Sequence, residues 1–338
     1  MKITKTKSSQ AASLLCAGIA GAGLMGQWHA HALRRAGGRV IAFADVDTSS
    51  ANSLAQAHAA LAFSSLDDLL TRAPIDVLHI CTPPATHEEM ASQALDAGVH
   101  VLAEKPLTPD AVSTARLLEK AHARGRLLLP VHQMVFQRGM RQVKTHLSRL
   151  APLLHLEVIA TTAGGEKTGA EGLDPLVADI LPHPLSIFQH FLPEGLDGSE
   201  WSVLHPSPGE LRAQGQAQRI SLAINLSARG RPTRNVFNII GARGSAHVDL
   251  YHGFAVFEGG QTSRTQKIMR PFGLALRTLT AATLNLATRT WQNEPAYPGL
   301  LELIRADYDA IRKGEPAPLS PLDILAVARA RDRLISAW

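Results

Sequence analysis

Three glycines, Gly21, Gly23 and Gly26, follow an apolar run of strand length and precede a segment that can form a helix. The order of strand, glycine turn and helix is typical of a loop that binds a dinucleotide. In such a loop the first glycine permits a tight turn, the second lets the backbone approach a pyrophosphate, and the third lets the helix pack closely on the strand. The unpaired N–H groups at the helix N-terminus then bind the anion. The residues expected to contact the nucleotide are Gly21, Gly23, Leu24, Met25 and Gly26.

An acidic residue stands at the distance from this loop where a ribose contact is expected. Asp45 lies 24 residues after Gly21 and directly follows a second buried run, residues 39–44. A carboxylate at this place hydrogen-bonds the adenosine ribose and repels a 2′-phosphate, so we expect NAD in preference to NADP. The alternative is a solvated loop acid.

A proline-containing loop follows the strand predicted at residues 75–81. Its residues Thr82 and Pro83 are placed at the carboxyl edge of the sheet, where open α/β sheets bind ligands. The alternative is that these residues only end the strand. His87, at the start of the next helix, is assigned to the cofactor loop, although a surface histidine in the cap region is the more ordinary interpretation.

A lysine follows the strand predicted at residues 99–103, in the sequence Glu104-Lys105-Pro106. This places Lys105 on the same sheet edge as the other loops. An ammonium group there can hydrogen-bond a substrate oxygen and stabilise the alkoxide that forms as a hydride leaves. The alternative is a surface ion pair between Lys105 and Glu104.

The elements that must position these residues change in character along the chain. Strand and helix patterns alternate over the first 131 residues, which predicts a doubly wound parallel sheet with helices on both faces. A capping box is expected at Ser65, and a helix start with Thr108 as N-cap and Pro109 at its first position. Beyond residue 150 the strand-like runs follow one another, which predicts a mostly antiparallel sheet with one helix near residues 182–192. We expect a Rossmann domain at residues 1–134 and an α/β domain at 135–338, with the last helix, 320–337, packing back on the first domain.

The composition excludes several classes of protein. The 338 residues are 45% hydrophobic, the net charge is +5, and no basic run exceeds a pair, so nucleic-acid binding is not indicated. Cys16 and Cys81 lie in strand-like runs, which predicts buried free thiols and fits a reducing cytoplasm. The basic start and apolar residues 11–20 imitate a secretory signal, but cleavage would remove the glycine loop, so we reject this interpretation. No segment reaches the ~18 apolar residues of a membrane span.

The sequence resembles the glucose-fructose oxidoreductase, inositol dehydrogenase and rhizopine catabolism (Gfo/Idh/MocA) family. The resemblance rests on GIAGAGLMG, FADVD, CTPPATH and AEKPLT in this order and spacing, and NIIGARGSAHVDL and SPLDILAVARARDRL fit the second domain. It implies a nicotinamide-binding Rossmann domain and a second domain whose open sheet faces the active site and forms the subunit interface of a homodimer or homotetramer. It also implies that Lys105 is catalytic.

The second motif of the family corresponds to residues 179–183, with Leu181 where glycine is usual. The resemblance implies that His183 is the general base and that Asp179 orients it or binds substrate. Because Pro182 suits the first position of a helix, His183 falls in the first turn, where the helix dipole would lower its pKa. A histidine held there for packing is the alternative. The resemblance further indicates substrate contacts at His132, Gln133 and Ser186.

The expected function is an NAD-dependent oxidoreductase that transfers a hydride between nicotinamide and a hydroxyl or keto carbon of a sugar, polyol or nucleotide-sugar. No metal is expected. Two alternatives remain open: an enzyme of the same family that cleaves glycosides while cycling NAD, and a catalytically silent NAD-binding regulator. Residues 273–289 could lie on a membrane surface, but a helix that covers the second domain or a neighbouring subunit is favoured because its basic charge is sparse.

Overall fold

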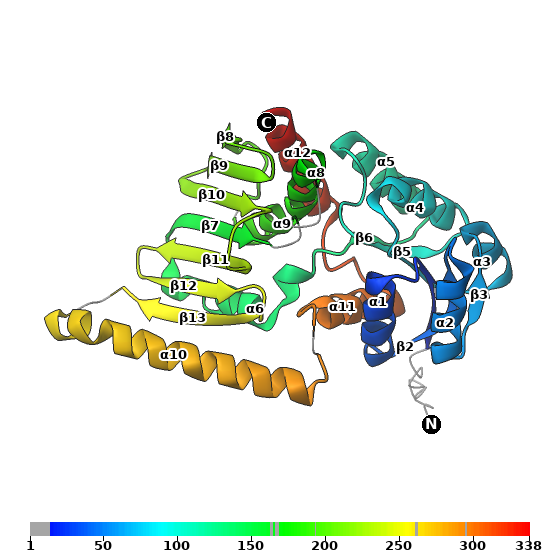
Figure 1. The fold of residues 1–338 in the computed structure, drawn as a ribbon, viewed down its shortest axis with the longest axis horizontal. Coiled ribbons are helices and arrows are strands. Elements are labelled where there is room, and N and C mark those ends of the chain that lie inside the picture. Colours follow the sequence, from blue (N-terminus) through cyan, green and yellow to red (C-terminus); the bar gives the residue numbers. More distant parts are fainter. Residues whose placement is uncertain (1–13, 163–164, 166–168, 193, 261–262, 295) are drawn as a thin grey trace, which may run out of the picture.

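Two sheets, each with its own helices, make up the chain (Figure 1). The computed structural model describes residues 14–162, 165, 169–192, 194–260, 263–294 and 296–338. Residues 1–13, which include the basic part of the signal-like start, therefore lie outside the described residues. In the described part of the chain, no helix is both long and apolar enough to span a bilayer.

The first sheet is the predicted Rossmann sheet. Its six parallel strands run in the order β3-β2-β1-β4-β5-β6. The strands are β1 (Leu15–Ala20), β2 (Gly38–Ala44), β3 (Leu61–Phe63), β4 (Val77–Ile80), β5 (His100–Ala103) and β6 (Leu128–Pro130). The helices are α1 (Leu24–Arg35), α2 (Thr48–His58), α3 (Leu66–Arg72), α4 (His87–Asp96) and α5 (Ala111–Ala123), with the 3-10 turn η1 (Pro84–Thr86) before α4.

Helix starts in this domain follow the local cap chemistry, with one correction to the sequence prediction. Ser65 caps α3 as expected, because its side chain accepts a hydrogen bond from the Asp68 N–H. The predicted cap of α5 at Thr108 is wrong: the N-cap is Asp110, whose carboxylate accepts from the Ser113 N–H. Thr108 instead donates its hydroxyl to the carbonyl of Asp110. The Asp110 carboxylate therefore accepts the hydrogen bond from a free helix N–H that Thr108 was expected to accept.

A short connection leads from β6 to the second sheet through η2 (Gln133–Phe136), α6 (Arg138–Thr145) and α7 (Leu147–Leu150). Seven strands follow in the order β13-β12-β11-β7-β10-β9-β8. They are β7 (Leu153–Thr161), β8 (Glu200–Leu204), β9 (Glu210–Ala217), β10 (Ile220–Ser227), β11 (Arg234–Gly241), β12 (Gly244–Asp249) and β13 (Phe254–Gly259). The sheet is mostly antiparallel as predicted, but β7 and β10 pair in parallel, so it is a mixed sheet.

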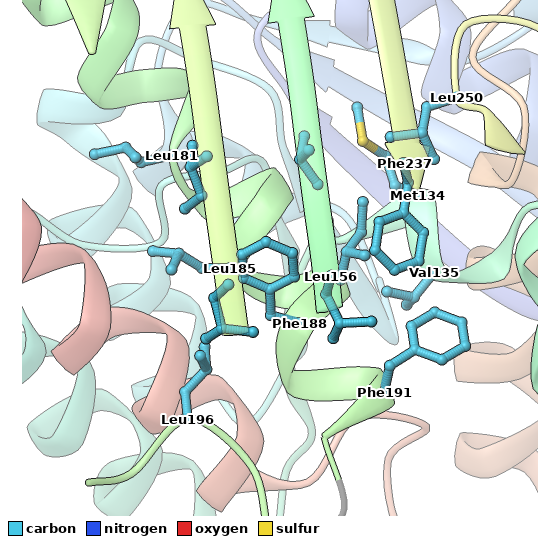
Figure 2. Close-up of a cluster of buried hydrophobic side chains, with 14 of the residues drawn as sticks. Met134, Val135, Leu156, Leu181, Leu185, Phe188, Phe191, Leu196, Phe237 and Leu250 are labelled. Carbon is cyan, nitrogen blue, oxygen red and sulfur yellow. The ribbon is translucent and has the colours of Figure 1, made fainter. Parts of the chain in front are cut away.

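One face of this sheet forms the core of the second domain. Leu156 and Phe237 on that face pack with Leu185 and Phe188 of α9 (Pro182–Phe191), which follows α8 (Ala170–Ile180) (Figure 2). The other face is polar and half-exposed. There the Glu157 carboxylate accepts hydrogen bonds from the amides of Asn225 and Asn238 on the neighbouring strands.

Three helices end the chain and tie its parts together. Helix α11 (Leu300–Lys313) packs on α1, and α12 (Pro321–Ser336) packs on both α9 and α5. The Ala111 N–H at the start of α5 donates to the Asp332 carboxylate of α12. Helix α10 (Arg264–Trp291) lies along β13 at the sheet edge (Figure 1), and its outer side exposes Phe272, Leu279 and Leu286.

Candidate active site

The glycine loop has the geometry that the sequence predicts for a dinucleotide site. Gly21 has φ +96°, and a Cβ there would lie 2.6 Å from the Cys81 carbonyl group. A Cβ on Gly26 would lie 2.0 Å from the Gly21 oxygen, so only glycine lets α1 start so close to the turn. No atom lies within 4 Å of the Cβ position of Gly23. The backbone is therefore open at the point where a pyrophosphate would approach the N-terminus of α1.

Asp45 lies beside this loop, at the carboxyl end of β2. Its Oδ2 accepts a hydrogen bond from the Ala22 N–H at 2.6 Å, and its Oδ1 accepts from the Asp47 N–H at 2.9 Å. Each carboxylate oxygen can accept a second hydrogen bond, so capacity for a ribose hydroxyl remains. The side chain that was expected to read the ribose also fixes the loop that would hold the pyrophosphate.

The other two predicted loops meet through a buried histidine. The ring nitrogens of His87 lie 2.8 Å from the carbonyl oxygens of Thr82 and Pro106. The interpretation of His87 as a surface residue is wrong, because its side chain is fully buried. His87 holds the two loops against each other, which leaves its ring nitrogens no capacity to contact a cofactor.

Glu104 is held on the inner side of the Glu104-Lys105-Pro106 loop. Its Oε1 lies 3.2 Å from Nε2 of His29 on α1, and its Oε2 accepts from the Lys105 N–H at 3.3 Å. Burial raises the pKa of Glu104, but the hydrogen bond from His29 and the charge of Lys105 outweigh it and leave the pKa below its usual value. The expected surface ion pair between the Glu104 and Lys105 side chains is absent among the described contacts.

Lys105 reaches across to the second domain. Its Nζ donates to the backbone carbonyl of Asp179, at 3.1 Å, in the last turn of α8. The charge of Lys105 also acts on His183 of α9 and on His132, which follows β6. The structure thus brings together Lys105, His132 and His183 from three separate segments, as their predicted roles require.

The two histidines of this cluster have unpaired ring nitrogens. Nδ1 of His132 and Nδ1 of His183 are both shielded from solvent and have no hydrogen-bond partner in the structure. Burial, with Lys105 and His132 adding to it, holds the pKa of His183 well below its usual value. Burial, and then Lys105, lowers the pKa of His132 to about 4, against the opposing charge of Glu104. Both imidazoles are therefore neutral at pH 7 and can accept a proton.

The lowered pKa of His183 has a different origin from the one expected. Pro182 is the first residue of α9, as predicted, which places His183 in the first turn. However, Leu181 is itself helical and its N–H donates to the Val177 carbonyl, so α8 runs into α9 almost without a break. The dipole at that junction is largely cancelled, and burial beside a cation takes its place as the cause.

A cavity of about 830 Å³ opens next to His183. It lies between η2, α9, the turn after β12, the end of α10 and the segment that leads to α11, and its volume is within the range of ligand sites. The amide oxygens of Gln133 and Gln137 in its wall are buried without a partner. These atoms accept hydrogen bonds from hydroxyl groups, which a polyol supplies.

Four of the expected catalytic and substrate residues do not line this cavity: Lys105, His132, Asp179 and Ser186. Ser186 is buried and its hydroxyl donates to the carbonyl of His183 within the helix, at 2.8 Å. The Asp179 carboxylate makes no hydrogen bond to His183, and its charge acts on Arg331 of α12 instead. The contribution of Asp179 to the site is its backbone carbonyl, which holds Lys105.

Sequence reasoning missed most of the cavity wall, including Tyr297 and Gln137. Tyr297 has φ +49° and its ring packs on Trp28 of α1, so it joins the second domain to the helix of the glycine loop. Its pKa is raised by burial and then by the charge of Glu104. The sequence could have indicated Tyr297, because this residue stands among turn-forming residue types before a predicted helix. Loop residues at such positions often carry function.

Comparison with known proteins finds relatives of the NAD-binding part of the chain. Residues 15–132 match the family model described as "Oxidoreductase family, NAD-binding Rossmann fold". An inositol 2-dehydrogenase from Leifsonia xyli is 41% identical over 104 residues, which are 30% of this chain and 31% of that protein. An inositol 2-dehydrogenase from Renibacterium salmoninarum is 32% identical over 182 residues, 52% of this chain and 54% of that protein. The chain thus matches a third to about half of the length of these relatives.

The fold extends this likeness over nearly the whole chain. The structure of the UDP-N-acetylglucosamine 3-dehydrogenase from Acidithiobacillus ferrooxidans superposes with a TM-score of 0.73 at 19% identity, covering 96% of this chain and 98% of that one. The predicted two-domain architecture is confirmed. As its motifs predicted, the NAD-binding part of the chain, residues 15–132, matches the Gfo/Idh/MocA oxidoreductase family.

Proposed function

We propose that this protein is an NAD-dependent oxidoreductase that acts on a hydroxyl or keto carbon of a sugar, a polyol or a nucleotide-sugar. The observation that carries the proposal is the neutral His183 in the wall of an 830 Å³ cavity, where the charge of Lys105 acts on it. A base and a fixed cation side by side are what the oxidation of an alcohol requires.

The chain's own residues divide the work as follows. His183, in the cavity wall, accepts the hydroxyl proton of the substrate on its neutral imidazole. Lys105, fixed by the Asp179 carbonyl, stabilises the negative charge that develops on the same oxygen. Gln133 and Gln137 accept hydrogen bonds from further hydroxyls and so orient the ring or chain of the substrate.

The residues of the glycine loop fit a bound dinucleotide. Gly21, Gly23 and Gly26 with Leu24 and Met25 hold the pyrophosphate, and Asp45 holds the adenosine ribose. Thr82, Pro83, Glu104 and Lys105 border the nicotinamide end. The carboxylate of Asp45 favours NAD over NADP. When bound, the nicotinamide accepts or donates the hydride.

The polar face of the second sheet supports a further proposal, that the protein forms a homodimer or homotetramer through this sheet. The face is half-exposed and its side chains are already ordered by the hydrogen bonds of Glu157. We also propose that it works in a cytoplasmic setting, where Cys16 and Cys81 stay free. Light scattering tests the first proposal: replacing Glu157 by Lys is expected to lower the particle mass, and an unchanged mass excludes this face.

The function is tested by following the absorbance band of reduced nicotinamide while free and nucleotide-linked sugars and polyols are mixed with protein and NAD. We expect net reduction of NAD with at least one of them, and a weaker response with NADP. Turnover of a glycoside without net NADH would favour the NAD-cycling alternative. Tight NAD binding with no turnover of any compound would favour the silent regulator.

A further inference from the structure

Four buried polar side chains form a single chain of hydrogen bonds below the glycine loop. Tyr308 Oη lies 2.8 Å from Nε2 of His79, and Nδ1 of His79 lies 2.9 Å from Nδ1 of His29. Nε2 of His29 then lies 3.2 Å from Oε1 of Glu104. The side chains come from α11, β4, α1 and the loop after β5, so the chain joins Tyr308 near the C-terminus to the residue next to Lys105.

Because these groups are buried, each of their polar atoms needs a hydrogen-bond partner within the protein. His29, His79 and Tyr308 are each fully buried, and Glu104 is 9% exposed. Water cannot replace a missing partner there, and an unpaired buried polar atom costs free energy. All the ring nitrogens of both histidines have a partner, in contrast to His132 and His183.

The position of each proton in this series of hydrogen bonds can be deduced by starting from Tyr308. In the described residues the Tyr308 hydroxyl has one hydrogen-bonding neighbour, Nε2 of His79, so Tyr308 donates to it. Burial lowers the pKa of His79 far below its usual value, so its ring carries one proton, on Nδ1. That proton is donated to Nδ1 of His29, which leaves the proton of His29 on Nε2, facing Glu104.

We propose that Tyr308 and His79 are positioning residues, which act through His29 to hold its proton on Nε2 and so keep a hydrogen bond on the Glu104 carboxylate beside Lys105. Without a donor at Tyr308, His79 can carry its proton on Nε2 instead. His29 would then have to donate from Nδ1, and its bare Nε2 would face the carboxylate. The hydroxyl of Tyr308 therefore controls, through two imidazoles, the charge that borders the site of hydride transfer.

The first test needs no substrate. Protonated and unprotonated imidazole nitrogens differ widely in 15N chemical shift. In protein labelled with 15N-histidine, the resonances of His29, assigned from the His29→Gln variant, are expected to show a neutral ring with the proton on Nε2. A proton on Nδ1, or on both nitrogens, would overturn the proposal.

The second test is a double-mutant cycle, whose activity arm rests on the proposed function. Tyr308→Phe keeps the ring and removes only the hydroxyl. We expect it to shift His29 toward the Nδ1-protonated form and to lower kcat about 2- to 12-fold, the range that corresponds to one hydrogen bond. In His29→Gln the amide nitrogen can donate to Glu104 without a tautomer to set, so adding Tyr308→Phe is expected to leave kcat unchanged.

The outcomes separate the two proposals. An equal loss of kcat from Tyr308→Phe in both backgrounds would show a merely structural role and would overturn the inference. If no sugar or polyol is turned over, the proposed function fails, but the 15N spectra of the wild type and of Tyr308→Phe still decide the inference. Thermal unfolding of each variant identifies any loss that is caused by unfolding.

Discussion

One pair of histidines, His29 and His79, leads to Glu104, and another, His132 and His183, feels the charge of Lys105; the two pairs differ in how completely they are hydrogen-bonded. His29 and His79 have partners at every ring nitrogen. His132 and His183 each leave Nδ1 without one. The hydrogen bonds of the first pair are complete within the protein, whereas the second pair keeps hydrogen-bonding capacity for a ligand. The fold bears the cost of two unpaired buried atoms in the cluster around Lys105, and of these two histidines only His183 lines the cavity.

The largest effect is expected from removing the base. His183→Asn should lower the rate of alcohol oxidation by about 10²- to 10⁴-fold, because no other neutral imidazole in the cluster faces the cavity. Its stability should change little, since Nδ1 makes no hydrogen bond to lose. Steady-state kinetics and urea unfolding measure the two effects. Full activity in a folded variant would remove His183 from the chemistry.

The next largest effect is expected at Lys105. Lys105→Met should lower kcat by about 10²- to 10³-fold, as the loss of one preorganised charge at a developing oxyanion does. NAD binding, measured by fluorescence quenching, should weaken far less than kcat falls, since the glycine loop is intact. Lys105→Arg is the matched control for charge. An equal loss of NAD affinity and of kcat in Lys105→Met would assign Lys105 to cofactor binding alone.

A smaller effect, and one on stability, is expected from the saturated pair. His79→Leu leaves Nδ1 of His29 and the Tyr308 hydroxyl buried without partners, so it should lower the free energy of unfolding by about 1–3 kcal/mol for each unpaired group. Chemical denaturation measures the change, with His183→Leu as the matched control in the other pair. A control that is as unstable as His79→Leu would abolish the distinction between the pairs.

The smallest effect is expected on the pH profile. The lowered pKa of His183 means that its ring stays neutral below the usual histidine value of about 6.5. Oxidation should therefore keep its kcat/KM as the pH falls from 7 to about 6, and decline only as the pH approaches the lowered value. An acid limb centred near pH 6.5 would show that His183 titrates as an ordinary exposed histidine.

The residues that the sequence predicted best are those with a local code. The glycine loop, Asp45 and Lys105 each follow a strand directly, so the parallel sheet brings them to one edge. Most strands of the Rossmann sheet and of the second sheet followed from their hydrophobic patterns. The short β3 and β8 and the helix α8 were not predicted, since three to five residues give little periodicity and α8 continues into α9.

What could not be predicted depends on contacts between distant segments. His29, His79 and Tyr308 look like isolated polar residues in apolar stretches, and 229 residues separate His79 from Tyr308. The hydrogen bond from Lys105 to the Asp179 carbonyl could not be predicted either, because a backbone carbonyl is the same in every residue type. The sequence suggested that the Ser186 hydroxyl could bind substrate. In the structure this hydroxyl donates a hydrogen bond to the His183 carbonyl instead.

The most direct test of the central claim is to trace the hydrogen on the substrate carbon. A substrate found in the sugar and polyol screen is labelled with deuterium on the reacting carbon, and the released NADH is analysed by mass spectrometry. The account predicts NADH that carries one deuterium with the wild type, and almost none formed with His183→Asn or Lys105→Met. Unlabelled NADH, or full turnover with both variants, would contradict it.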